Sequence, residues 1–408
     1  MTKKASTPAL RFKGFTYTWK QRKLSDQFSD FIVPMRDKPK KFGGNIPWTR
    51  IEDIEGKYLN GSLSGQFVSK DTIKQMNLKI IPKDSLIVSS SATFGVVAII
   101  TQDLITNQTF IGLVPNDKET LDFWYTFFHS NEARNYMRLQ SAGSTIFYIA
   151  REHFEKMPII IPFKDEMITI GKYFSNLDRL ITLHQRKYDK LTNMKKSMLE
   201  KMFPKNGANV PEIRFKGFTD AWEQRKLGEA VQEVTRNDAT SDAPIMMITA
   251  NNGFIEQSER YAFNNAGESL KKYILLEKGE LAYNHGASKL RPYGSCFTLT
   301  TSENARIPFV YHCFSADEQN SEFLSIELNG ADVENQLRRI VSSGARMDGL
   351  LNISFQEYVS VSVLLPTIEE QNKIADFFKN LDRLITLHQS ELEKLKNLKK
   401  ACLEKMFV

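Results

Sequence analysis

Histidine and cysteine are the side chains of this sequence best suited to catalysis or metal binding, and their spacing supports neither. The cysteines, Cys296, Cys313 and Cys402, have no close-pair spacing, which excludes a disulfide framework and a four-thiolate zinc site. We expect them to be reduced and packed. The histidines are scattered, and His312 lies next to Cys313, so the two side chains would point to opposite faces of a strand. The sequence therefore indicates no metal site.

Other catalytic motifs are also missing from the sequence. It has neither a Gly-x-x-x-x-Gly-Lys-Ser/Thr phosphate loop nor a Gly-x-Gly-x-x-Gly turn after a strand. It also lacks the Asn/Asp-Pro-Pro-Tyr/Phe sequence with which amino-methyltransferases hold a flipped adenine. We therefore predict that this chain alone catalyses no reaction and binds no cofactor.

The composition is that of a globular protein with two to three domains. Of its 408 residues, 41% are apolar and 25% are charged. No apolar run reaches the ~18 residues of a membrane span, and residues 1–10 lack the apolar core of a signal peptide, so we expect a cytoplasmic protein without a membrane partner. The net charge of +7 favours a polyanionic partner. This excess is mild, so binding to a nucleic acid would also depend on geometry and partners.

An internal duplication organises the chain, with an offset of 203 to 204 residues. Residues 8–24 return as residues 211–227, and both copies contain Arg-Phe-Lys-Gly-Phe-Thr. Residues 176–185 are identical to residues 380–389, with the sequence Asn-Leu-Asp-Arg-Leu-Ile-Thr-Leu-His-Gln. We call these repeated stretches the constant blocks. A period this long predicts two similar domains rather than a solenoid.

The variable segments, residues 25–162 and 228–366, lie between the constant blocks and show little resemblance to one another. Both read as mixtures of strand and turn. In the first, β-branched runs flank a small-residue loop at 89–95, and in the second the run 273–283 leads into a polar loop at 284–289. The two loops occupy comparable places in unlike sequences, so we expect shared scaffolds with different exposed surfaces.

A long helix is predicted after each variable segment, because apolar residues recur three and four positions apart. The first stripe consists of Leu177, Ile181, His184, Tyr188, Leu191, Met194, Met198 and Met202. The second consists of Leu381, Ile385, His388, Leu392, Leu395, Leu398, Cys402 and Met406. Pro204 ends the first helix. Both histidines lie on these stripes, so we predict that they pack in a helix seam rather than catalyse.

In this order, the blocks resemble the specificity subunit of type I restriction-modification enzymes over nearly the whole chain. The resemblance is carried by the paired constant blocks together with the Ile-Pro-Trp element at 43–53, the segment 279–289 and the segment 365–375. Met167 departs from the pattern where the second copy has Gln371, and His285 stands where the family often has lysine.

The resemblance implies an α+β fold: two mixed target-recognition domains joined by two long helices, packed as an antiparallel coiled coil with a pseudo-twofold internal repeat. We place the first target-recognition domain at 1–165 and the first conserved spacer helix at 166–204. The linker and second target-recognition domain then span 205–368, and the second spacer helix spans 369–408.

The resemblance also implies a DNA-binding function in a complex. Each domain of such a subunit reads one half of a bipartite, asymmetric site in double-stranded DNA, and the paired helices set the gap. Two partner methyltransferase subunits, docking on the conserved helices, methylate adenine N6, and restriction/translocase subunits cleave unmodified DNA. S-adenosylmethionine, ATP and Mg²⁺ are then expected on these partners, and no cofactor on this chain.

The residues expected to contact DNA are donors and acceptors on exposed loops, with basic and hydroxyl groups for the backbone. In the first domain they are Ser89, Ser90, Ser91 and Thr93, and a second group Ser62, Ser64, Gln66 and Lys70. In the second domain they are Asn284, Ser288, Lys289, Arg291 and Tyr293, and a group Ser342, Ser343 and Arg346. The alternative is ordinary turn chemistry and solvated basic side chains. Trp19, Trp48 and Trp222 are instead predicted to be core residues.

The predicted helices carry most of the excess charge. Residues 166–201 hold eight basic and four acidic residues, and residues 369–405 hold eight and seven, so together they account for +5 of the +7. Solvated helix faces with pairs such as Glu391 and Lys394 explain this. Contact with the DNA backbone or docking of methyltransferase helices are the functional alternatives, and we favour docking. A self-contained DNA-modifying enzyme and a self-associating coiled-coil protein are the competing classes of function.

Overall fold

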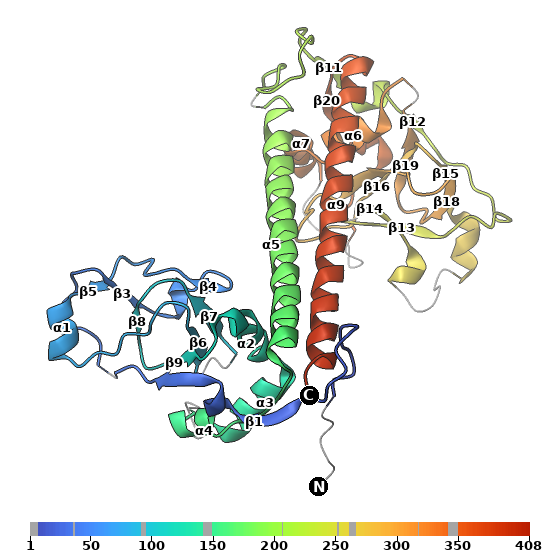
Figure 1. Ribbon diagram of the computed structural model, residues 1–408. Helices are drawn as coiled ribbons and strands as arrows, with labels where there is room; N and C mark the ends of the chain where they lie inside the picture. The colour runs from blue at the N-terminus through green and yellow to red at the C-terminus, as the bar shows by residue number, and fades with distance from the viewer. Residues whose placement is uncertain are drawn as a thin grey trace. The chain divides into compact units, whose positions relative to one another are not determined.

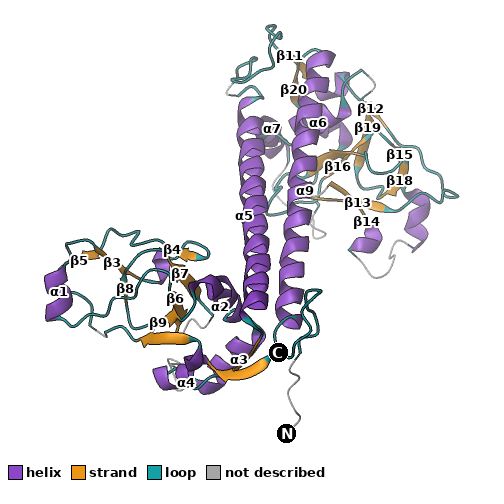
Figure 2. Cartoon of the chain, in the orientation of Figure 1, coloured by secondary structure: helices purple, strands orange, loops and turns teal. Residues whose placement is uncertain are grey.

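The computed structural model describes residues 7–35, 37–90, 95–141, 149–205, 207–250, 253–260, 267–316, 318–341 and 350–408. The chain divides into two compact units. The first unit contains Met1–Lys187 and His388–Val408, and the second contains Tyr188–Leu387. Both units combine helices with strands, purple and orange in Figure 2, and the predicted α+β class is confirmed. The units take parts of both long helices, so the four-part division of the sequence stays a prediction.

The first unit is built around a five-stranded sheet in the order β2-β9-β6-β7-β4 (Figure 1). The strands are β2 (Phe28–Ile32), β4 (Tyr58–Leu59), β6 (Leu86–Ser89), β7 (Val97–Ile100) and β9 (Phe110–Pro115). Only the β4–β7 pairing is parallel among these. Every residue of β6 and β7 is buried, whichever face it points to, and all of them are apolar except Ser89 at the end of β6.

Smaller elements complete the first unit. A three-stranded sheet has the order β5-β3-β8, from β3 (Ile46–Thr49), β5 (Phe67–Val68) and β8 (Ile105–Thr106). β1 (Lys20–Lys23), in the first constant block, pairs antiparallel with β10 (Pro158–Ile161). The short helices are α1 (Lys70–Gln75), α2 (Leu121–Phe127), α3 (Asn131–Gln140) and α4 (Arg151–Glu155).

The second unit repeats the same strand order in an unlike sequence. Its main sheet has the order β12-β19-β16-β17, which corresponds to β2-β9-β6-β7 of the first unit. The strands are β12 (Gln232–Glu233), β16 (Leu281–Asn284), β17 (Ser295–Thr298) and β19 (His312–Ser315), all antiparallel. β6 and β16 therefore occupy equivalent positions in the two sheets.

Three strand pairs and three short helices surround this sheet. The antiparallel pairs are β11 (Glu223–Lys226) with β20 (Ser362–Leu365), β13 (Met246–Thr249) with β14 (Gly253–Glu256), and β15 (Ile274–Glu277) with β18 (Asn304–Ile307). The helices are α6 (Ser321–Leu328), α7 (Ala331–Ile340) and α8 (Phe355–Tyr358). The β11–β20 pair repeats the β1–β10 pair, so the constant blocks make the same sheet contact in both units.

The two long helices are α5 (Lys164–Lys201) and α9 (Ile368–Lys405), of 38 residues each. They begin at equivalent positions, although Met167 and Gln371 differ. The helices are antiparallel within each unit. In the first unit Asp178 pairs with Lys399 and Tyr173 contacts Cys402, so the α9 number rises as the α5 number falls. None of the described helices has both the length and the apolar composition needed to cross a membrane.

The three tryptophans predicted to be core residues and the three thiols are buried. Trp19, Trp48 and Trp222 are 3%, 2% and 2% exposed. All three cysteines are buried and free, and burial raises the pKa of the Cys296 thiol to about 12. A thiol in this state is a poor nucleophile and a poor metal ligand.

Candidate nucleic-acid interface

The loop between β16 and β17 is a compact turn held by its own polar groups. Asn284 Nδ2 donates to the carbonyl of Ile248 (3.1 Å), and Asn284 Oδ1 accepts from the Gly286 amide (2.9 Å). Farther along, the Ser288 amide donates to the Arg291 carbonyl (3.0 Å), and the Arg291 amide donates to Ser288 Oγ (3.0 Å). The loop therefore presents a defined surface and not a loose chain.

The side chains after the turn attach this loop to the rest of the second unit. Arg291 Nη1 donates to the Asn329 carbonyl at the end of α6 (2.8 Å). The Tyr293 carbonyl accepts from the Tyr283 hydroxyl (2.6 Å). Among the predicted DNA contacts here, Asn284, Arg291 and Tyr293 thus shape the loop, whereas Ser288 and Lys289 are exposed.

Gly294 lets the chain return from this loop into β17. Its φ is +83°, a conformation that residues with a side chain rarely adopt. A Cβ at this position would lie 2.6 Å from the Asn284 carbonyl oxygen and 2.7 Å from the Tyr283 ring. Only glycine allows the backbone to approach both groups this closely.

The second predicted group of the first unit lies between β4 and α1. Ser62 Oγ bonds Ser64 Oγ (3.1 Å) and accepts from the Gln66 amide (3.2 Å). Ser64 and Lys70 are exposed, and Ser62 and Gln66 are half-buried. Lys70 is the first residue of α1, directly after the capping Ser69. The structure brings these residues onto one short stretch with hydroxyl, amide and ammonium groups accessible.

Asp53, which was not among the predicted residues, organises this stretch. Its carboxylate is 4% exposed and accepts from the amides of Leu63 (2.7 Å) and Arg50 (2.7 Å). The bond to Leu63 fixes the loop that contains Ser62 and Ser64. The spacing of Arg50 and Asp53 around a tight turn is a local sign of the bond between them. The bond from Leu63 to Asp53 joins residues ten positions apart and has no local sign in the sequence.

The prediction that Ser89 and Ser90 lie on an exposed loop is wrong. Both are 0% exposed. Ser89 ends β6, and the Ser90 hydroxyl donates to the Thr109 carbonyl (3.2 Å), while its own carbonyl accepts from the Ile149 amide (2.8 Å). β6 extends through Ser89, although its small polar side chain is typical of a loop. Small hydroxyl residues also fit where neighbouring segments pack closely. Neither side chain can reach a ligand in this conformation.

Five other predicted contacts cannot be placed. Ser91, Thr93, Ser342, Ser343 and Arg346 lie outside the described residues. Ser91 and Thr93 follow β6, and the other three follow α7. Their contact with DNA stays a prediction.

The first half of the chain matches a known domain family. The profile for the type I restriction modification DNA specificity domain matches residues 18–193. The type I restriction enzyme MjaVIII specificity subunit of Methanocaldococcus jannaschii is 22% identical over 400 residues, covering 90% of each chain. The chain is therefore similar to a type I restriction-modification specificity subunit over 90% of its length, and residues 18–193 match the DNA specificity domain.

Two further comparisons agree with this family. The MjaIX specificity subunit of the same organism is 25% identical over 235 residues, 55% of this chain, and the chain spans about half of that relative, 54%. The crystal structure of the type I restriction-modification S subunit from M. genitalium has a TM-score of 0.53 at 16% identity, and covers 98% of this chain and 99% of its own. At this identity the structural likeness supports the fold of the specificity subunit.

Paired ionic contacts close the seam between α5 and α9 in each unit. In the first unit Lys399 Nζ lies 2.5 Å from Asp178 Oδ1, and in the second unit Lys195 Nζ lies 2.5 Å from Asp382 Oδ1. These residues are equivalent in the duplication, because both members of each pair are 204 positions from their counterparts. The seam is therefore a repeated structure whose two versions differ little.

Two arginines clamp the constant blocks to the starts of the long helices. Arg11 Nε and Nη2 donate to the two carboxylate oxygens of Glu166 at 2.6 and 2.7 Å. Arg214 makes the same two bonds to Glu370, both at 2.7 Å. Hydrogen bonding to these carboxylates raises the pKa of both guanidinium groups. The repeated Arg-Phe-Lys-Gly-Phe sequence marked both arginines, but nothing local marked their partners.

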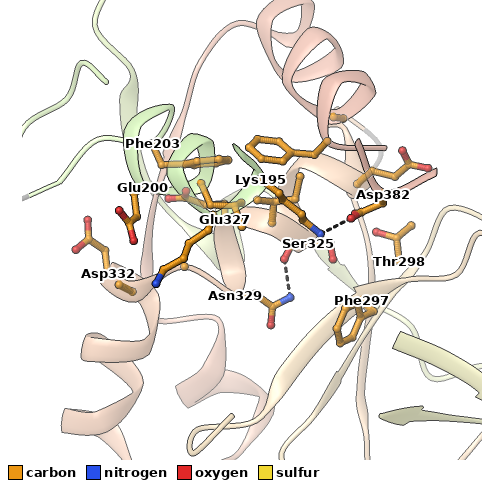
Figure 3. Close-up of a pocket in the computed structure, with 18 of the residues that line it drawn as sticks. Lys195, Glu200, Phe203, Phe297, Thr298, Ser325, Glu327, Asn329, Asp332 and Asp382 are labelled. Atoms are coloured by element: carbon orange, nitrogen blue, oxygen red, sulfur yellow. Dashed lines mark hydrogen bonds and ion pairs between the residues drawn. The ribbon is translucent and has the colours of Figure 1, made fainter. Parts of the chain in front are cut away.

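The second unit also has a cavity of about 800 Å³, lined in part by the end of α5 (Figure 3). Its wall includes Lys195, Phe203, Asn329 and Glu327. Burial raises the pKa of Glu327 to about 7, and its carboxylate accepts from the Leu364 amide (3.1 Å). Within the described ranges, no group of three or more His, Cys, Asp or Glu side chains could hold a metal ion. The wall of the cavity thus combines polar and apolar side chains.

Proposed function

We propose that this specificity subunit directs a methyltransferase complex to a bipartite, asymmetric DNA sequence, with one unit reading each half-site. The observation that carries the proposal is the repeated strand order β2-β9-β6-β7 and β12-β19-β16-β17, which is built from unlike sequences. Reading two different half-sites needs one scaffold with two different surfaces. An internal duplication with diverged loops supplies both.

The gap between the half-sites is set by α5 and α9. Each helix contributes to both units, and 38 residues span about 57 Å at ~1.5 Å per residue. One turn of DNA is ~34 Å, so a helix pair of this length can connect two major-groove contacts on one face of the duplex. The matched ion pairs of Asp178 with Lys399 and Lys195 with Asp382 support a stiff seam.

The DNA-facing surfaces include the stretch from Ser62 to Lys70 and the loop from Asn284 to Tyr293. Exposed Lys70 and Lys289 suit phosphate contact, and the hydroxyls of Ser64 and Ser288 can donate to or accept from phosphates and base edges. The bonds that fix these loops prepare them for binding, because less conformational entropy is lost when they engage DNA.

The chemistry belongs to partner subunits in this proposal. Two methyltransferase subunits dock on the conserved helices and methylate adenine N6 with S-adenosylmethionine, and restriction/translocase subunits use ATP and Mg²⁺ to cleave unmodified DNA. This chain takes no part in bond making. Docking is favoured over contact with the DNA backbone because the constant helices present the same sequence twice, which suits two copies of one partner.

Exchange of one variable segment tests the function. Residues 25–162 are replaced by the equivalent segment of another specificity subunit, and the chain is co-expressed with its partner methyltransferase. Sequencing of methylated adenines should then show one changed half-site, with the other half and the gap unchanged. The reciprocal exchange of 228–366 should change the other half only. Methylation at the same sites in cells without this chain, or a change in both halves after one exchange, would contradict the proposal.

Shortening both long helices tests their role as a spacer. Removal of residues 186–192 and 390–396 keeps the seven-residue register and leaves both ion pairs, Asp178 with Lys399 and Lys195 with Asp382, at the ends of the shortened stretch. Each helix becomes about 10 Å shorter. The methylated site should keep both half-sites and lose about three base pairs of gap at ~3.4 Å each. Deletion from α5 alone is the control and should abolish methylation; an unchanged gap in the double deletion would remove the spacer role.

A further inference from the structure

His184 and His388 contact each other across the seam of α5 and α9 in the first unit. Their Nδ1 atoms are 3.2 Å apart, and the ring centroids are 5.1 Å apart with the planes at 68°. The two residues are equivalent in the duplication, since each is the ninth residue of the identical block Asn-Leu-Asp-Arg-Leu-Ile-Thr-Leu-His-Gln. The two copies of one side chain therefore meet each other, and not some other residue.

This distance is that of two ligands on one transition-metal ion. Zinc binds imidazole nitrogen at about 2.0–2.1 Å in tetrahedral geometry, which places two such nitrogens about 3.3 Å apart. Imidazole nitrogen also suits Cu²⁺ and Ni²⁺. Two neutral imidazoles at this distance can instead share one hydrogen bond. The hydrogen bond and the metal ion would use the same two atoms, the Nδ1 atoms of His184 and His388.

We propose that the His184–His388 pair binds one divalent transition-metal ion, with Zn²⁺, Ni²⁺ or Cu²⁺ held by two imidazole nitrogens and water in the other coordination positions. Both side chains are half-buried, so an ion and its water ligands have access from solvent. An ion bound here would tie α5 to α9 at equivalent positions of the two copies. It would strengthen the helix pair without touching the recognition loops.

The charges around the pair allow this binding. Lys187 lies near His388 and Glu391 lies near His184, one opposite charge on each helix. Glu391 is paired with Lys394 at 2.9 Å. Farther along the seam, Asp178 and Lys399 neutralise each other. These side chains carry three positive and two negative charges, so the ion is bound through its nitrogen ligands rather than through a field of acidic groups.

The test uses the untagged full-length chain with ZnCl₂, NiCl₂ or CuCl₂ as the only added ligand. Calorimetry should show one ion per chain, and the midpoint of thermal unfolding should rise with ion concentration by mass action. Cu²⁺ should raise it most, and Mg²⁺, which prefers oxygen ligands, should leave it unchanged. Electron paramagnetic resonance of the Cu²⁺ complex should show hyperfine coupling to two nitrogens.

Single substitutions assign the site. His184→Gln and His388→Gln should each abolish the one-ion binding and the two-nitrogen spectrum, with helix content by circular dichroism unchanged. His153→Gln, which alters an exposed histidine on α4, is the matched control and should bind as the natural chain does. The proposal is overturned if the natural chain shows neither the binding nor the rise in midpoint, or if both signals persist in the two seam variants. If a variant fails to fold, the electron paramagnetic resonance spectrum of the natural chain with Cu²⁺ still tests whether two nitrogens bind the ion.

Discussion

Replacing Arg214 with methionine should lower the free energy of unfolding of the second unit by about 3–5 kcal/mol. The Glu370 side chain is 0% exposed, and Arg214 satisfies both of its carboxylate oxygens at 2.7 Å. Loss of the guanidinium leaves a carboxylate that can neither reach water nor find a charge. Urea denaturation monitored by circular dichroism measures the loss.

Two further variants separate a buried charge from an ordinary surface ion pair. Arg225→Met breaks a pair with Glu223 whose side chains are 37% and 63% exposed, so its effect on stability should be much smaller than that of Arg214→Met. The double variant Arg214→Met with Glu370→Leu should recover most of the loss, because no charge is then buried. Equal losses for Arg214→Met and Arg225→Met would refute this account.

Replacing Phe407 with alanine should destabilise the first unit by about 3–5 kcal/mol. Phe407 lies at the end of α9, yet it packs in the first unit. It is 8% exposed, and its ring centroid is 5.8 Å from that of Phe123, 6.1 Å from Phe127 and 6.2 Å from Phe174. Removal of the ring leaves a cavity among three other aromatic side chains, which cannot collapse to fill it.

Hydrogen exchange measured by mass spectrometry locates this effect. Amides of α2 should exchange faster in the Phe407→Ala variant, whereas amides of α6, in the second unit, should keep their rates. Leu398→Ala is the matched control on the same helix, because Leu398 is 45% exposed, and it should change stability by less than about 0.5 kcal/mol. Faster exchange in α6 than in α2 would show that Phe407 does not belong to the core of the first unit.

The equivalent aromatic contact in the second unit shows how the duplication contributes to packing. Phe203, equivalent to Phe407, lies two residues after the end of α5, and its ring is 5.8 Å from the Trp222 and Phe323 rings and 6.1 Å from the Phe378 ring. The phenylalanine that follows each long helix thus packs in the core of the other half of the duplication. Phe203 packs in the second unit, and Phe407 packs in the first. Conservation of this residue in both copies reflects packing, which the sequence alone could not separate from a role in partner binding.

The recognition loops illustrate the limits of local reasoning. Ser288 was expected in a loop and lies there, and Asn284 is the last residue of β16, since a β-branched run followed by polar and glycine residues is a reliable sign that a strand ends. Ser89 and Ser90 follow a similar run and are buried. Their burial depends on Thr109 and Ile149, which lie 19 and 59 positions farther along than Ser90, and no window around residue 90 contains either.

The amino-acid sequence by itself determined the duplication, the two long helices and the family, because identity between copies and a three-and-four spacing of apolar residues are local properties that can be read along the chain. Only the tertiary structure decided that Arg11 clamps Glu166, that Phe407 enters the first core, and that His184 meets His388. These contacts join residues 155 or more positions apart. Their existence depends on the free energy of the packed chain, in which buried charges must be paired and apolar surface removed from water, and not on the preference of any short segment.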